Sequence, residues 1–156
     1  MILLGITVAA HAQPTDLMQQ IAGSWFLADE SLTFPDGRTI KSWGKEPYGY
    51  LGFDGDSHFS MMLIRSDLPK FETRGSGTLQ QNDAIAKGLI AYYGSYAAGD
   101  DGTSVVVHII GSTFAAFNDT VSRRPLEFRG HDEFVMHVLV PNSGVKTELV
   151  WRRAGK

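Results

Sequence analysis

Hydrophobic and polar residues alternate along most of the chain with the period of two that is typical of β-strands. Aromatic, β-branched and aliphatic residues gather in short runs, and clusters of Gly, Pro, Asn, Asp and Ser separate the runs, because these residues bend the backbone at little cost. The pattern predicts strands at residues 24–34, 48–53, 58–64, 92–97, 104–112, 121–129, 134–140 and 147–153.

Two segments show the helical period of 3.6 residues instead. Leu17, Met18 and Ile21 predict a short N-terminal helix over residues 15–22, and a longer apolar stripe predicts a helix over residues 80–92. This second helix is inserted between the third and fourth strands. Eight strands joined by hairpin-length turns favour an all-β fold, an antiparallel up-and-down barrel, because closure removes exposed strand edges and leaves an interior for one small ligand.

Composition narrows the possible functions. A chain of 156 residues has room for one domain. The net charge of -3 provides no general field for phosphate backbones, so we expect no nucleic-acid partner. The absence of cysteine excludes thiolate metal sites, disulfides and thiol nucleophiles. The histidines show no compact ligand spacing, so we expect no metal and no cofactor.

The N-terminal segment resembles an export signal. Residues 2–12 are apolar and end in Ala10-His11-Ala12, a small-x-small pattern that a signal peptidase can cut. We interpret residues 1–12 as the remnant of a signal peptide and residues 13–156 as the barrel domain, which predicts a periplasmic or secreted protein. If this segment is not a signal, we expect a cytoplasmic protein. The apolar run is shorter than the roughly 20 residues that span a bilayer, so no integral membrane span is predicted.

Several motifs resemble a known family. Gly23-Ser24-Trp25 is similar to the G-x-W signature of lipocalins, and residues 43–51 contain a G-x-x-P-x-G segment that leads into a hairpin. With residues 65–71, 92–96 and 149–153, these motifs resemble the bacterial and fungal lipocalin-like domain family over nearly the whole chain from Gly23. The resemblance implies an eight-stranded calycin-type barrel with a helix between its third and fourth strands. Such barrels serve as carriers or, in natural-product pathways, as pockets that cyclise a flexible substrate.

The alternation of side chains along each strand also predicts which residues line the interior. A mostly apolar cavity with a few convergent polar groups is typical of a small-molecule site. For the strand at residues 58–64 the opposite face remains an alternative, because a shift of one residue exchanges the two faces. Trp25 and Arg153 are predicted to stack and close the barrel floor. The predicted ligand-binding residues are Phe59, Met61, Leu63, Tyr92, Tyr96, Val106, His108, Arg124, Leu126 and Trp151.

These residues favour the binding of a small, largely hydrophobic molecule. The first alternative is a cyclase or isomerase without a cofactor, in which His108 is the general base and Arg124 stabilises a developing negative charge. Asp29, predicted to share a face with Trp25, could orient such a histidine. The second alternative is a structural or envelope protein whose barrel is filled by its own side chains. The sequence leaves the ligand and the oligomeric state open.

Overall fold

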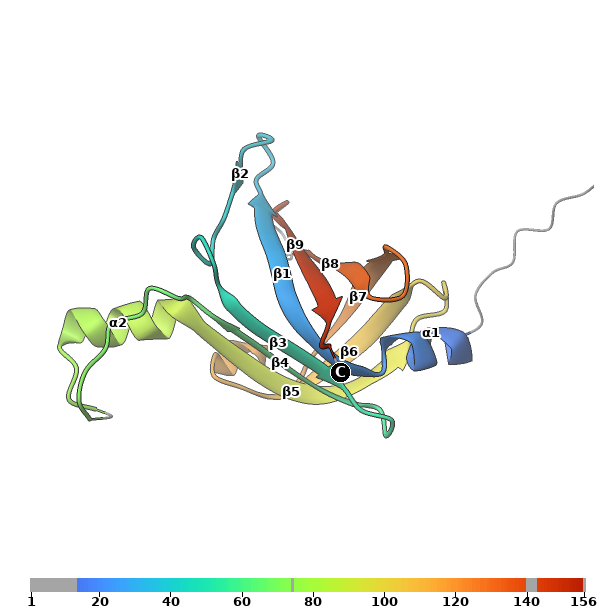
Figure 1. Ribbon diagram of the computed structural model, residues 1–156, viewed down its shortest axis with the longest axis horizontal. Coiled ribbons are helices and arrows are strands. Elements are labelled where there is room, and N and C mark those ends of the chain that lie inside the picture. Colours follow the sequence, from blue (N-terminus) through green and yellow to red (C-terminus); the bar gives the residue numbers. More distant parts are fainter. Residues whose placement is uncertain (1–13, 74, 140–142, 156) are drawn as a thin grey trace, which may run out of the picture.

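The computed structural model describes residues 14–73, 75–139 and 143–155, and it shows a closed, mostly β architecture with a helix at each end (Figure 1). The apolar segment interpreted as a signal remnant, residues 1–12, lies outside the described residues. The elements in chain order are α1 Pro14–Ile21, β1 Gly23–Thr33, β2 Thr39–Ile40, β3 Tyr48–Phe53, β4 His58–Ile64, α2 Leu79–Gly88, β5 Leu89–Ala98, β6 Ser104–Ser112, the 3-10 helix η1 Ala115–Phe117, β7 Thr120–Phe128, β8 Glu133–Leu139 and β9 Lys146–Arg153.

Antiparallel pairing of the first and last strands closes the sheet into a barrel. Each long strand pairs with the next one along the chain, from β1 and β3 through to β8 and β9. The β1–β9 ladder then runs from Trp25 opposite Arg153 to Thr33 opposite Lys146. This confirms the predicted eight-stranded up-and-down barrel. The additional two-residue strand β2, which the sequence pattern does not signal, folds back on the end of β1.

The inserted helix is shorter than predicted. Thr78 caps α2 through a reciprocal capping box with Gln81, and the helix ends at Gly88 rather than at Tyr92. A Cβ atom at Gly88 would lie 2.5 Å from the Leu68 side chain, so glycine permits this close approach of the preceding loop. The apolar residues that follow fit both periods, and pairing of Leu89 with Ile64 on β4 places them in β5.

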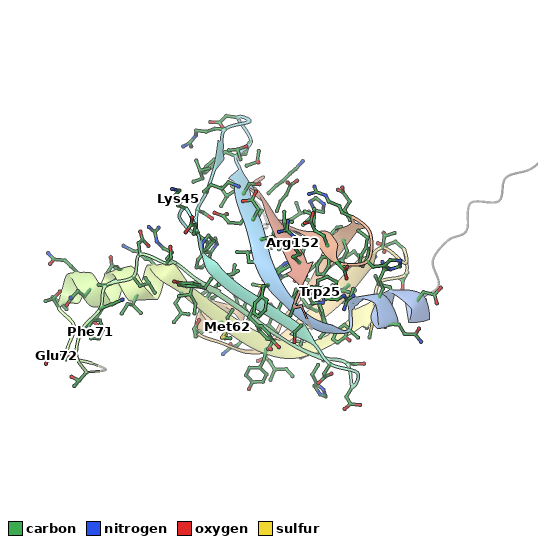
Figure 2. The ribbon with its side chains drawn as sticks, in the orientation of Figure 1. Trp25, Lys45, Met62, Phe71, Glu72 and Arg152 are labelled. Atoms are coloured by element: carbon green, nitrogen blue, oxygen red, sulfur yellow. The ribbon has the colours of Figure 1, made fainter. Side chains whose placement is uncertain are left out.

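One end of the barrel is packed solid. The Trp25 ring contacts Phe134 edge-on, with ring centroids 4.6 Å apart, and its indole Nε1–H donates to the Ile21 carbonyl of α1 at 2.8 Å. The Arg153 guanidinium lies over the Trp25 ring at 4.1 Å and donates to the carbonyls of Gln20 and Ala22. These contacts fasten α1 across the end of the barrel, where Trp25 is labelled in Figure 2.

The other end carries α2, which projects beyond the strands (Figure 1). Phe71 and Glu72, in the loop that precedes this helix, lie far from Trp25 (Figure 2). Apart from Gly88, no residue of α2 is buried. No helix within the described residues is long and apolar enough to cross a membrane.

A glycine at the centre of β5 provides a test of the barrel geometry. The β5–β6 register shifts between Tyr93 and Gly94, and a Cβ atom at Gly94 would lie 1.8 Å from the His108 carbonyl oxygen. Because that neighbour is a backbone atom, which cannot move aside as a flexible side chain can, we expect Gly94→Ala to lower the free energy of unfolding by about 1–3 kcal/mol, the usual cost of overpacking. Urea denaturation measures it. The control Gly55→Ala, with nothing within 4 Å of the new atom, should change it by less than about 0.5 kcal/mol; equal effects would contradict this account.

Candidate functional site

A cavity of about 500 Å³ occupies the end of the barrel nearest to α2. Its volume falls within the roughly 300–1,000 Å³ of small-molecule sites. Most of its wall is apolar, so it can remove a hydrophobic guest from water. The lining residues are Trp43, Met61, Leu63, Ile85, Ala86, Lys87, Leu89, Ile90, Tyr92, Thr113, Phe114, Phe117, Arg124, Val138, Thr147 and Leu149.

Met61, Tyr92 and Arg124 form the inner end of this cavity, which we call the cavity floor. Met61 lies opposite Tyr92 across the β4–β5 ladder, and all three side chains are buried. On each of their strands, the next inward-facing bulky residue toward the packed end lies in the core and does not line the cavity; these residues are Phe59, Tyr96 and Leu126. The floor therefore marks the boundary between the hollow and the packed halves of the barrel.

Arg124 has an exposed fraction of only 7 %. Its Nη1 donates to the Tyr92 hydroxyl at 2.9 Å and its Nε donates to the Ser122 hydroxyl at 3.3 Å. The guanidinium carbon also lies 5.7 Å from the centroid of the Tyr92 ring. The Tyr92 hydroxyl in turn donates to the Met61 sulfur at 3.1 Å. A chain of hydrogen bonds thus orients the one buried cation among the described residues toward an apolar chamber.

Aromatic side chains and α2 form the mouth of the cavity. Phe114, just before η1, and Phe117, within it, pack edge-on with ring centroids 5.0 Å apart, and both are exposed. The Thr113 backbone N–H donates to the Ala91 carbonyl, and the Ala91 backbone N–H donates to the Thr113 hydroxyl oxygen; these two hydrogen bonds hold this loop against β5. On the other side, Lys87 of α2 forms an ion pair with Asp83 at 2.8 Å. The mouth combines exposed rings with a neutralised charge.

Glu30 holds the remaining wall in place. It is 2 % exposed, and its carboxylate accepts hydrogen bonds from the Trp43 backbone N–H at 2.9 Å and from the Ser42 hydroxyl at 3.2 Å. The sequence pattern placed Asp29 on this inward face. That prediction is wrong, because a bulge between Leu27 and Asp29 shifts the alternation by one residue. Asp29 is exposed and pairs with Lys41, whose hydrogen bond is the main cause that lowers its pKa.

Four of the predicted ligand-binding residues line the cavity: Met61, Leu63, Tyr92 and Arg124. Four others are buried in the core without lining it: Phe59, Tyr96, Leu126 and Trp151. Tyr96 donates its hydroxyl proton to the Asp54 carbonyl at 2.7 Å, and burial raises the pKa of this phenol. The indole Nε1–H of Trp151 is buried and has no hydrogen-bond partner among the described residues.

The remaining two, Val106 and His108, lie on the opposite face of β6. The inward face of β6 carries Val105, Val107 and Ile109, which are buried. The His108 side chain, on the outer face, is 43 % exposed and lies 3.9 Å from Asp119. The predicted face of this strand is therefore wrong. Residues 105–110 are apolar at both parities apart from His108, so alternation could not fix the phase. The candidate general base lies outside the cavity.

A second hollow, of about 510 Å³, lies against the outer face of the sheet. Tyr93 and Ile110, which are both exposed, border it, so it is a surface groove. In the part of the chain that the structure describes, no three His, Asp or Glu side chains gather in an arrangement that could hold a metal ion.

Comparison with known proteins gives one matching family model and three similar solved structures. A family model described as a lipocalin-like domain matches residues 22–154. Three solved structures are similar. One is a redesigned β-barrel, with 12% identity, covering 89% of this chain and 96% of that one, at a TM-score of 0.45. Another is a de novo designed fluorescence-activating β-barrel, with 12% identity, 89% and 98% coverage and a TM-score of 0.46.

The third is a redesigned β-barrel bound to DFHBI, with 14% identity, 88% and 98% coverage and a TM-score of 0.44. These likenesses are too low to identify a ligand. No curated protein matches the chain at a significant level.

The Glu30 contacts predict how the cavity wall responds to substitution. Glu30→Ala leaves the half-buried Trp43 N–H without its acceptor, so we expect the free energy of unfolding to fall by about 1–3 kcal/mol. Acrylamide quenching of tryptophan fluorescence should also increase, because Trp25 and Trp151 are fully buried and Trp43 is not. Glu30→Gln keeps an acceptor oxygen and should retain most of the stability. Asp29→Ala removes only an exposed pair and serves as the neighbouring control; if it has the larger effect, the wall is not held by Glu30.

Proposed function

The chain belongs to the lipocalin-like domain family, and on that premise we propose that its barrel binds one small, largely hydrophobic molecule. The observation that carries this proposal is the mostly apolar cavity of about 500 Å³, open at its mouth, above a floor that holds Arg124 and Tyr92. Burial of apolar ligand surface contributes about 25 cal/mol per Å², against which the cost of association and ordering must be set. The chamber provides this area, and the floor provides groups that can orient the guest.

Binding is supported better than the two alternatives. The cyclase or isomerase required His108 as a base inside the barrel, and this side chain lies on the outer face of β6. The histidine cannot reach a molecule in the cavity through the intact sheet. A structural protein with a filled barrel requires side chains across the whole axis, yet packing fills only the half around Trp25 and Trp151.

Two adjacent methionines on β4 provide a matched test of binding. Met61 lines the cavity and is 4 % exposed, whereas Met62 faces outward and is 41 % exposed. Met61→Trp should narrow the chamber at its floor, so we expect the affinity for the neutral dye Nile red to fall at least tenfold. Met62→Trp should leave the affinity unchanged. Fluorescence titration of the dye measures both, with circular dichroism to verify the fold; Leu63→Trp replaces the first variant if overpacking prevents its folding.

An equal loss of dye binding in the Met61 and Met62 variants would place the dye on the outer surface and contradict the proposal. Native mass spectrometry of the protein purified from its own host gives an independent measurement. We expect a co-purifying small molecule on the wild-type protein and its absence from Met61→Trp.

A further inference from the structure

Arg124 differs from every other arginine that the structure describes. The six others each lie within 3.8 Å of a carboxylate oxygen. Arg123, the preceding residue, is exposed and pairs with Asp101 at 2.7 Å. Arg124 is the most buried of them, and no described carboxylate lies within ion-pair distance of it. Burial makes an unpaired charge costly, and Arg124 is a buried charge without a described carboxylate partner.

Among the residues that the structure describes, no carboxylate contacts the Arg124 guanidinium. Glu30, the one buried carboxylate among the described residues, is engaged by Trp43 and Ser42. The arginine side chain carries a permanent positive charge. An anion that enters the cavity would neutralise the charge of Arg124. The described residues that line the cavity include no carboxylate, and the cavity is the space from which an anion can reach Arg124.

The unused hydrogen-bond donors at the cavity floor are numerous enough to bind a carboxylate. A guanidinium has five N–H groups. Tyr92 and Ser122 accept from two of them, which leaves three that donate to no described residue. The Tyr92 O–H donates only to the thioether of Met61, which is a weak acceptor. The planar fork of arginine matches the two oxygens of a carboxylate, and the phenol can turn its proton to one of them.

We propose that the molecule bound in the barrel is an apolar monocarboxylate, with its carboxylate on Arg124 and Tyr92 at the cavity floor and its hydrocarbon body toward α2 and η1. This inference rests on the proposed function and specifies its ligand class. A single cation at the floor matches a single negative charge. Lys87, the other cation that lines the cavity, is at the mouth and already pairs with Asp83, so a dianionic phosphate would remain half compensated.

The test compares decanoate with methyl decanoate, which share one hydrocarbon chain and differ in charge. Displacement of Nile red from the wild-type protein at neutral pH measures both affinities. We expect decanoate to bind about tenfold to a hundredfold more tightly than the ester, the range for a hydrogen-bonded charge. Arg124→Gln should abolish this preference, so that decanoate and its ester bind this variant with similar affinities. Arg123→Gln, with the charge removed from the outer face, should keep the full preference.

Tyr92→Phe provides a second variant that retains the cation. It removes one donor, so the preference for decanoate should fall by about threefold to tenfold. Equal wild-type affinities for acid and ester, or a preference that survives Arg124→Gln, would overturn the carboxylate assignment while the binding function stands. A wild-type protein that takes up neither Nile red nor either probe would overturn the proposed function, and this inference with it.

Discussion

The structure depends on the pairing of β1 with β9. Without this ladder the sheet would keep two open edges, and the side chains that now face one another across the interior would face solvent. The Trp25 and Arg153 contacts lie at one end of the ladder and join it to α1. Closure and plugging are therefore linked, because the residues that pair the terminal strands also build the packed end. The cavity exists only because the same strands continue beyond that plug.

The interior of the barrel has a packed half and a hollow half. Around Trp25, Phe134 and Trp151 the packing leaves no room for a guest, and this half supplies the dense apolar contacts on which stability depends. Around Arg124 the side chains leave a chamber of about 500 Å³. Its outer boundary is made of α2 and the loop of η1, which hold few buried residues. Rigid packing thus positions the floor, while the less buried elements border the entrance.

Much of this arrangement could be predicted from the sequence. Strand number, order and closure follow from the spacing of turn residues, and the inward faces of β5, β7 and β9 follow from alternation, whereas alternation left both faces of β4 open. Alternation fails where both parities are apolar, as at Val105 to Ile110, and where a bulge adds a residue, as before Asp29. The same limits explain the role of Glu30, which no local signal marks. Its contacts to Ser42 and Trp43 exist only after the following loop folds back.

Arg124 lies at the boundary between the packed half of the barrel and the cavity. A buried guanidinium without a carboxylate opposes folding, and its bonds to Tyr92 and Ser122 offset only part of that cost. An apolar residue of similar length would fill the same position at lower cost, so core packing alone does not explain the charge. The packed half around Trp25 can tolerate it, because closure and the plug do not depend on the floor. Local violations of the rules of burial are expected where a protein meets its ligand, and in this barrel the largest such violation faces the open chamber.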